Sequence, residues 1–212
     1  MEFLVIGTGR SGTGYMSKLL TSNGKPCGHE SIYGVPVNFV MYQSIEKYNL
    51  NYKGDSSWLA VPFISQILSI NPETTFIHIV RNPIDVIKSF LELDFFNDIN
   101  LRNSPYVRLI SDNINLKGKT QLERAIAYYI GWFEMIESSN IKNKIFLQLE
   151  NIDYDLLSST LGVEIKPLNK VINDKKNKKR ITLNRKDVKQ QIENSSRFLE
   201  LKEIVKKYNY EL

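Results

Sequence analysis

The sequence has little cysteine, histidine and tryptophan: Cys27 is the only cysteine, and the 212 residues contain two histidines and two tryptophans. A single cysteine excludes an internal disulfide framework and is typical of a reducing compartment. Because no His, Cys, Asp or Glu residues have metal-ligand spacing, we expect no metal ion.

Long apolar runs and a strong charge of one sign are also absent. No apolar segment approaches the roughly 20 residues that cross a membrane, and no signal-peptide pattern fits ahead of the first expected strand. The net charge of +5 and the pI of about 9.1 suit an anionic ligand, but without a basic motif they do not indicate nucleic-acid binding. We therefore expect a cytoplasmic protein with no membrane span and no nucleic-acid partner.

Strands and helices are expected to alternate along the chain. Apolar runs predict buried strands at residues 3–6, 76–80 and 144–149. Helical spacing predicts helices over these ranges: 12–22, 58–70, 83–95, 120–133 and 155–161, with one or two more within 187–208. Residues 97–118 are polar and rich in asparagine, which predicts a long loop. The alternation predicts an α/β protein with a mainly parallel central sheet flanked by helices, in a single domain over residues 1–212.

Two of the expected helices have specific start signals. Asn82 is a favourable N-cap residue, with Pro83 at the first helical position and Asp85 in the first turn. Thr120 and Glu123 have the spacing of a capping box. The helices are therefore expected to begin directly after residues 82 and 120.

The glycine-rich sequence Gly7-Thr8-Gly9-Arg10-Ser11-Gly12 joins the first expected strand to the first helix. In a turn of this kind, backbone N–H groups and the helix N-terminus can surround an anion. The glycines fit the dinucleotide pattern G-x-G-x-x-G, and the first and last of them also have the spacing that opens a Walker A loop. A glycine turn with no ligand is a further alternative.

Neither nucleotide motif is complete. A Rossmann domain needs a second strand, about 20 residues further on, that ends in an acidic residue. Glu30 is near that distance, but residues 25–29 do not have the composition of a strand. A Walker A loop needs Gly-Lys-Ser/Thr, whereas Thr13 and Gly14 follow Gly12.

Arg10-Ser11-Gly12-Thr13 resembles instead the 5′-phosphosulfate loop of sulfotransferases that use 3′-phosphoadenosine 5′-phosphosulfate (PAPS). The segment from Arg81 to Ser89 resembles the 3′-phosphate motif of that family, an arginine at a strand end and a serine eight positions later. Arg81 follows an expected parallel strand, at the edge where open α/β sheets bind ligands, and Ser89 lies further along the next helix. Alternatively, neither residue binds a ligand: Arg81 forms an ion pair with Asp85, and Ser89 only packs against neighbouring side chains.

The resemblance extends over most of the chain. Residues 27–30, Cys-Gly-His-Glu, resemble the segment of tyrosylprotein sulfotransferases that carries the catalytic glutamate. Residues 128–132 resemble the aromatic helix that precedes the family's third strand, and residues 146–152 resemble the end of that strand.

Two positions depart from the family's pattern. Gly14 stands where relatives usually have a second Thr or Ser. The tyrosylprotein branch has a catalytic lysine before an aspartate, whereas here Gly54 precedes the aspartate and Lys53 is one position away. Three residues nearby are candidates for shaping the acceptor site or the adenine pocket: Asp55, Ser56 and Trp58. Trp58 is equally a candidate for the hydrophobic core.

The resemblance implies a P-loop NTPase-like sulfotransferase fold and transfer of the sulfuryl group of PAPS to an acceptor hydroxyl or amine, with adenosine 3′,5′-bisphosphate (PAP) as product. It implies that Glu30 is the catalytic base, that Arg10 stabilises charge on the leaving phosphate, and that His29 is the second candidate for the base. Donor binding is assigned to eight residues: Gly9, Arg10, Ser11, Gly12, Thr13, Gly14, Arg81 and Ser89.

Several alternatives stay open. His29 could be a turn residue bonded to the backbone, and His78, inside an apolar strand, is expected to be a buried core residue. The basic run at 174–180 is either a solvated loop or a segment that closes over the nucleotide. The acceptor could be a saccharide, a small metabolite or a protein tyrosine. Alternatives for the whole chain are a P-loop nucleotide kinase-like transferase and a non-catalytic nucleotide-binding protein.

Overall fold

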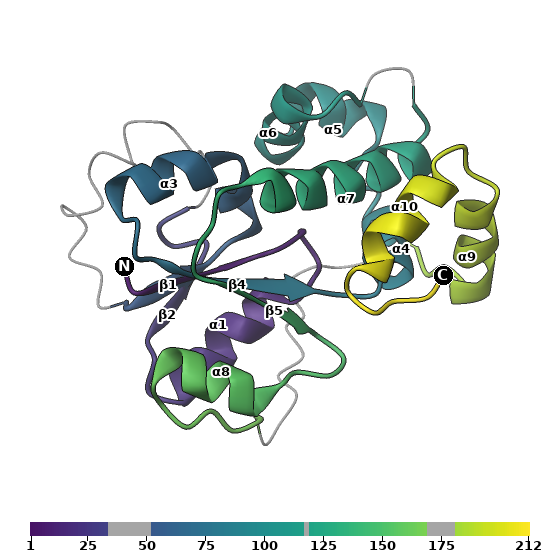
Figure 1. Ribbon diagram of the computed structural model, residues 1–212. Coiled ribbons are helices and arrows are strands. Elements are labelled where there is room, and N and C mark those ends of the chain that lie inside the picture. Colours follow the sequence, from purple (N-terminus) through teal and green to yellow (C-terminus); the bar gives the residue numbers. More distant parts are fainter. Residues whose placement is uncertain (34–51, 117–118, 169–180) are drawn as a thin grey trace. The chain divides into compact units, whose positions relative to one another are not determined.

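The computed structural model describes residues 1–33, 52–116, 119–168 and 181–212 (Figure 1). The basic run at 174–180 lies outside the described residues. Along the chain the elements are β1 (Phe3–Ile6), α1 (Thr13–Ser22), β2 (Cys27–His29), β3 (Gly54–Ser56), the 3-10 helix η2 (Trp58–Phe63), α3 (Ile64–Ile70), β4 (Thr75–Val80), α4 (Pro83–Glu92), α5 (Asp98–Asn103), α6 (Pro105–Asn113), α7 (Gln121–Ser138), β5 (Lys144–Gln148), α8 (Tyr154–Leu161), α9 (Arg185–Glu193) and α10 (Phe198–Lys206).

The chain forms two compact units. The first comprises Met1–Val80 with Ile136–Ile172, and the second comprises Arg81–Met135 with Asn173–Leu212. The sheet, α1, α3 and α8 belong to the first unit, whereas α4, α5, α6, most of α7, α9 and α10 belong to the second. A single domain over residues 1–212 stays a prediction.

The sheet of the first unit is parallel throughout the described residues, in the order β2-β3-β1-β4-β5. In the central strand β1, Leu4 lies opposite Asp55 of β3 on one side and Phe76 of β4 on the other. Helices cover both faces, α1 and α8 on one and η2 with α3 on the other (Figure 1), and all four β1 residues are fully buried. The predicted α/β fold with a parallel central sheet is confirmed.

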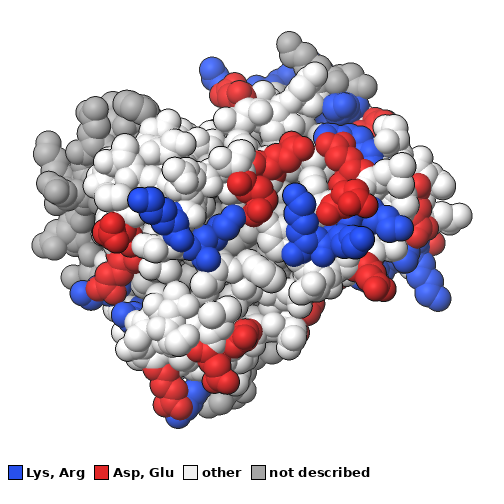
Figure 2. Space-filling model, in the orientation of Figure 1, with Lys and Arg blue, Asp and Glu red and all other residues white. Residues whose placement is uncertain are grey.

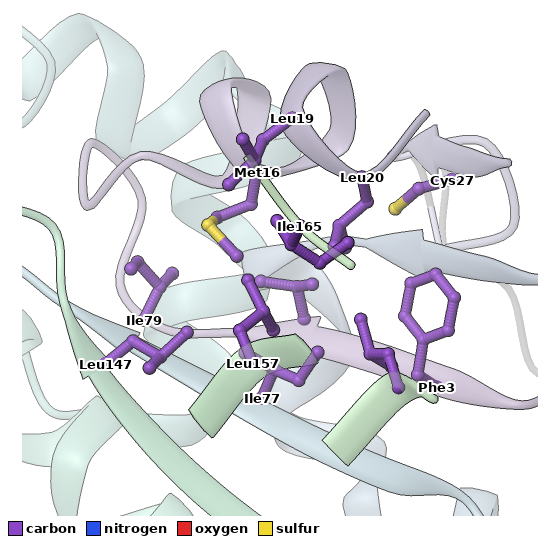
Figure 3. Close-up of a cluster of buried hydrophobic side chains, with 12 residues drawn as sticks. Phe3, Met16, Leu19, Leu20, Cys27, Ile77, Ile79, Leu147, Leu157 and Ile165 are labelled. Carbon is purple, nitrogen blue, oxygen red and sulfur yellow. The ribbon is translucent and has the colours of Figure 1, made fainter. Parts of the chain in front are cut away.

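A hydrophobic cluster holds α1 and α8 against one face of this sheet (Figure 3). Side chains alternate between the two faces of a strand, so every second residue of β1 and β4 contributes. The cluster contains Phe3, Val5, Met16, Leu19, Leu20, Cys27, Ile77, Ile79, Leu147, Leu157, Leu161 and Ile165. Because it anchors both β1 and α1, it fixes the two ends of the glycine loop that joins them.

Two short strands were not expected, and one of them corrects a step of the sequence interpretation. Cys27–His29 forms the strand β2, although residues 25–29 were not expected to be a strand. β2 pairs with β3 and not with β1. A Rossmann domain places its second strand next to its first. The dinucleotide interpretation therefore fails because of the strand order and not because a strand is missing.

The loop predicted over residues 97–118 is also wrong, since it contains α5 and α6. Asn97 caps α5 by accepting a hydrogen bond from Asn100 N at 2.7 Å. Ser104 caps α6, with Pro105 at its first position, and Val107 and Ile110 of α6 are fully buried. Each helix is short and begins with a polar cap residue, so the polar residues that indicated a loop are in part the caps of two helices.

The two predicted helix starts are confirmed. Asn82 Oδ1 accepts a hydrogen bond from Ile84 N at 3.0 Å at the start of α4. At the start of α7, Thr120 N donates to Glu123 Oε2 at 2.8 Å and Glu123 N donates to Thr120 Oγ1 at 3.3 Å. α4 ends at Glu92, a little before the predicted residue 95.

An aromatic cluster forms much of the core of the second unit. The rings of Phe90 and Phe96 are 5.2 Å apart, and each packs against Tyr128 of α7. Tyr128 in turn packs against Trp132, at 4.8 Å between ring centroids. The aromatic residues at 128–132 therefore face the interior of this unit.

Charges of both signs are interspersed on the surface. On the face drawn in Figure 2, Lys and Arg lie among Asp and Glu. Several exposed residues form ion pairs within their own segment, such as Arg197 with Glu200 at 2.6 Å and Lys166 with Glu164 at 3.0 Å. Exposed pairs of this kind contribute little to stability.

His78 of β4 is a fully buried histidine, as predicted. Burial, together with the positive charge of Lys144, lowers its pKa to about 3, and Glu137 opposes this change. The unfolded chain, with an ordinary histidine pKa near 6.5, binds a proton that the folded chain excludes. Above pH 6.5 His78 therefore does not lower the free energy of unfolding. As the pH falls from 6.5 towards 3, protonation of the unfolded chain lowers that free energy progressively.

Because of His78, we expect the free energy of unfolding to be about 2 kcal/mol lower at pH 5 than at pH 7. Urea unfolding at both pH values measures this loss. The variant His78→Leu lacks the titrating group, so its loss over the same interval should be smaller than that of the native protein by this amount. Equal losses in the two proteins would show that His78 does not stay neutral in the folded state.

Candidate active site

Glycine is required at two positions of the loop between β1 and α1, by a close backbone contact at Gly7 and by the backbone conformation at Gly12. A Cβ on Gly7 would lie 2.4 Å from the backbone oxygen of Ile79, and one on Gly12 would lie 2.6 Å from Leu149 Cδ1. Gly12 also has φ of 104°, in the region that residues with side chains rarely adopt. The glycines therefore let the chain turn sharply from the end of β1 into the start of α1.

Hydrogen bonds within the loop hold its shape. The amide and the hydroxyl of Ser11 both donate to the Thr8 carbonyl, at 3.2 and 2.6 Å. Arg10 lies in the left-handed region with φ of 69°, which is uncommon for a residue other than glycine. Among the described residues no side chain caps α1, so the amides of its first turn can donate to an anion.

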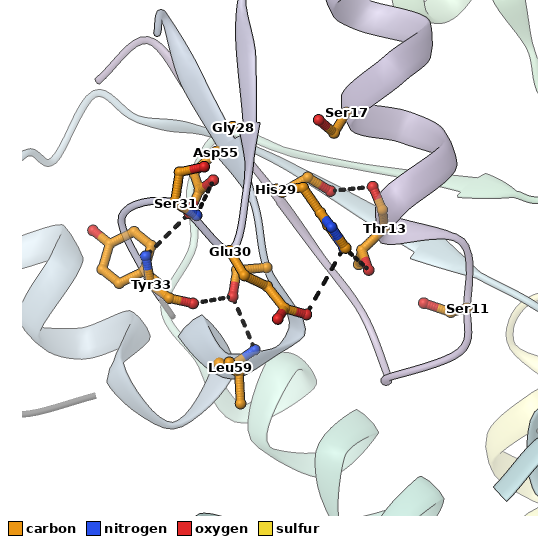
Figure 4. Close-up of polar contacts among 12 residues, drawn as sticks. Ser11, Thr13, Ser17, Gly28, His29, Glu30, Ser31, Tyr33, Asp55 and Leu59 are labelled. Atoms are coloured by element: carbon orange, nitrogen blue, oxygen red, sulfur yellow. Dashed lines mark hydrogen bonds and ion pairs between the residues drawn. The ribbon is translucent and has the colours of Figure 1, made fainter. Parts of the chain in front are cut away.

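The end of β2 brings two predicted site residues to this helix start. His29 Nε2 lies 3.4 Å from Thr13 Oγ1, and a Cβ on Gly14 would lie 3.3 Å from the His29 ring. Glu30 Oε1 is 3.8 Å from the same nitrogen, so Thr13 and Glu30 both face His29 Nε2 (Figure 4). Within the described residues, both polar contacts of the ring are to side chains, which corrects the alternative of a turn histidine bonded to the backbone.

The Glu30 carboxyl group is held in a partly buried position. Its side chain is 23% exposed, its backbone φ is 54°, and its N–H donates to Ser56 O at 3.1 Å. Burial raises the pKa of Glu30, and the negative charge of Asp55 acts in the same direction. His29 and a hydrogen bond from the Trp58 side chain lower it, but the net pKa is above the ordinary glutamate value. A carboxylate with a raised pKa is a stronger base.

The three candidates around residue 55 are all buried next to the start of α1 and Glu30. Asp55 and Ser56 are fully buried, and both bond to backbone groups of neighbouring segments. Ser56 Oγ donates to Thr13 O at 2.8 Å and ties the start of α1 to β3. Trp58 is 7% exposed and bonds to Glu30. Neither a hydrophobic periodicity nor a known motif in the sequence predicts these contacts of Asp55, Ser56 and Trp58.

Lys53 lies away from this site. It precedes β3, at the edge of the sheet where the strands begin, and its ammonium group pairs with Glu2 at 3.1 Å. The glycine loop and Glu30 follow the ends of β1 and β2, at the opposite edge. The possibility that Lys53 is a catalytic lysine therefore receives no support from its position.

Arg81 and Ser89 belong to the second unit. Arg81 follows the last residue of β4, and its carbonyl accepts a hydrogen bond from the Tyr129 hydroxyl at 3.0 Å. Ser89 lies in α4 and is 8% exposed. Asp85, the alternative partner considered for Arg81, pairs with Arg185 at 2.9 Å.

The predicted site residues therefore fall into two groups. The first unit contains the glycine loop and brings Thr13, Gly14, His29 and Glu30 together. Across the described ranges, no three His, Cys, Asp or Glu side chains lie close enough together to hold a metal ion. None of the helices in those ranges is sufficiently long and apolar to span a membrane.

A solved structure with a similar fold is the crystal structure of a sulfotransferase from Alicyclobacillus acidocaldarius. The similarity covers 100% of this chain and 96% of that chain, with a TM-score of 0.55 and 11% sequence identity. No protein-family model matches the chain, and a search of curated proteins finds no match. The predicted sulfotransferase fold is thus confirmed, whereas likeness at this identity says nothing of the reaction.

Proposed function

We propose that this protein is a PAPS-dependent sulfotransferase that acts on a hydroxyl or amine of a saccharide, a small molecule or a tyrosine. The observation that carries the proposal is the Glu30–His29 pair beside the start of α1, next to a glycine loop suited to an anion, in a chain with a sulfotransferase fold. A base and an anion site side by side are what transfer of a charged group to a hydroxyl requires.

The donor set of the loop fits a phosphosulfate group. Gly7 and Gly12 keep the loop free of side chains at its two tightest points, and no described side chain caps α1. Arg10, the hydroxyl of Thr13 and the amides of residues 12–14 would hold the 5′-phosphosulfate, while Ser11 keeps the loop in shape through its bonds to the Thr8 carbonyl. When bound, PAPS supplies the sulfuryl group and has PAP as its leaving group.

Arg81 and Ser89 would bind the 3′-phosphate. Arg81 follows a parallel strand at its carboxyl end, where such sheets bind ligands, and Ser89 follows it at the spacing of the family's 3′-phosphate motif. The pairing of Asp85 with Arg185 supports this role, because it gives that carboxylate a partner other than Arg81. A guanidinium group suits a phosphate through charge-assisted hydrogen bonds.

Glu30 would act as the general base. Its carboxylate accepts the proton of the attacking acceptor group, and its raised pKa strengthens it for that task. Arg10 and the loop amides stabilise the negative charge that develops on the leaving phosphate. His29, at 3.8 Å from Glu30, is the second candidate for the base, and the preference for Glu30 follows the likeness to the tyrosylprotein branch.

PAP should stabilise the native protein by about 2.7 kcal/mol at 100 times its dissociation constant, and ATP with magnesium should stabilise it far less. The reason is that only PAP carries the 3′-phosphate that Arg81 and Ser89 are proposed to bind. Thermal unfolding with each nucleotide measures the difference, and Arg81→Ala should reduce the preference for PAP. Equal stabilisation by ATP would favour a kinase-like nucleotide transferase, and binding of PAP without any sulfuryl transfer would favour a non-catalytic nucleotide-binding protein.

A further inference from the structure

We propose that Asp55 is a positioning residue that holds Glu30 in place as the base, an inference that rests on the proposed function. Asp55 lies in β3, between β1 and β2, and is fully buried. A buried carboxylate is costly unless hydrogen bonds satisfy it. Its presence in the middle of the sheet therefore needs an explanation.

The Asp55 carboxylate binds the backbone directly after Glu30. Its Oδ1 accepts a hydrogen bond from Ser31 N at 3.2 Å, and its Oδ2 accepts from Ile32 N and Tyr33 N, both at 3.1 Å (Figure 4). Three consecutive amides are thus fixed by one side chain. The carboxylate is satisfied, and the turn that follows Glu30 is tied to β3.

Glu30 is consequently held to β3 on both sides. Its own N–H donates to Ser56 O at 3.1 Å, and Asp55 binds the residues that follow it. Glu30 has φ of 54°, a conformation that costs a residue with a side chain free energy and persists only when its surroundings enforce it. The bonds from Asp55 supply that constraint and keep the Glu30 carboxylate facing His29.

Gly28 shows that the chain makes room for this carboxylate. In the parallel pairing of β2 with β3, Gly28 lies opposite Asp55. A Cβ on Gly28 would lie 2.5 Å from Asp55 Oδ1 and 2.7 Å from Ser31 Cβ. The small residue on β2 and the acidic residue on β3 are therefore parts of one arrangement.

Asp55 also acts on Glu30 through its charge. Within the part of the chain that the structure describes, the charged groups that act on the Glu30 carboxyl group are His29 at the end of β2, which lowers its pKa, and Asp55 on β3, which raises it. Loss of the Asp55 charge is therefore expected to lower the pKa of Glu30. Loss of an uncharged residue that ties the same turn should leave the titration of Glu30 unchanged.

The test compares Asp55→Asn with Ser57→Ala. Ser57 is a matched control, because it is also fully buried after β3 and ties the same turn by donating to Tyr33 O at 2.6 Å, but it carries no charge. We expect Asp55→Asn to bind PAP as the native protein does, to lose about tenfold or more in turnover, and to shift the acid limb of the kcat/KM profile to lower pH. Ser57→Ala should show neither change per folded molecule.

A double mutant separates positioning from an independent role. If Asp55 acts through Glu30, Asp55→Asn should cause no further loss of turnover in a Glu30→Gln background. A further tenfold loss there, or native turnover and pH profile in folded Asp55→Asn, would overturn the inference. If Asp55→Asn does not fold, Gly28→Ala takes its place, since the added methyl displaces Asp55 Oδ1 and should lower turnover in the same way.

Carbon-13 NMR titration of the Glu30 carboxyl group gives a readout that needs no activity. Asp55→Asn should lower the pKa of Glu30, and Ser57→Ala should leave it unchanged. If the native protein binds no PAP and transfers no sulfuryl group, the proposed function fails, but this titration still decides whether the charge of Asp55 acts on Glu30. An unchanged Glu30 titration in folded Asp55→Asn would overturn the inference by itself.

Discussion

Glu30→Gln is expected to lower turnover by about 10²-fold or more while PAP binding stays near that of the native protein. The amide keeps the size of the side chain and can still accept the hydrogen bond from Trp58, but it cannot take a proton from the acceptor. The acid limb of the kcat/KM profile should disappear together with the carboxyl group. Steady-state kinetics over pH 5 to 8 and calorimetric titration with PAP measure the two effects separately.

Two further variants distinguish the residues around Glu30. Arg10→Ala should weaken both PAP binding and turnover, because the guanidinium group meets the donor in the ground state as well as in the transition state. His29→Ala should have a mild effect if Glu30 is the base. An active Glu30→Gln beside an inactive His29→Ala would transfer the role of base to His29 and weaken the likeness to the tyrosylprotein branch.

Gly12→Ala is expected to destabilise the protein by about 2–5 kcal/mol and to abolish PAP binding. The new methyl group would lie 2.6 Å from Leu149 Cδ1, and the backbone φ of 104° is strained for alanine. Relief of the backbone strain changes φ at the start of α1 and so displaces the amides that are proposed to hold the phosphosulfate, while the collision pushes the Leu149 side chain aside. Urea unfolding and calorimetry with PAP measure both consequences.

Gly24→Ala is the matched control for this substitution. Gly24 also has a positive φ, 78°, but apart from its chain neighbours no atom lies within 4 Å of the position where its Cβ would be. Its replacement should cost only about 1 kcal/mol and leave PAP binding intact. In a Leu149→Ala background the cost of Gly12→Ala should become smaller, because the collision is removed and only the backbone strain remains. Equal costs for the two glycines would refute the proposed collision.

The sequence by itself determined the features that depend on neighbouring residues. The glycine loop, the Asn82 cap before Pro83 and the capping box of Thr120 with Glu123 are set by φ preferences and by hydrogen bonds over a few residues. The apolar runs of β1 and β4 predicted a buried parallel sheet for a similar reason, since a strand covered on both faces must be apolar throughout.

Only the tertiary structure decided the features that depend on pairing between distant segments. β2 and β3 have three residues each, too few to show a period, and they become strands because β3 pairs with β1 and then with β2. That pairing places the Asp55 carboxylate beneath the turn after Glu30 and carries Lys53 to the opposite edge of the sheet. Hydrogen bonds between parallel strands join residues far apart in the chain, so no local pattern in the sequence records them.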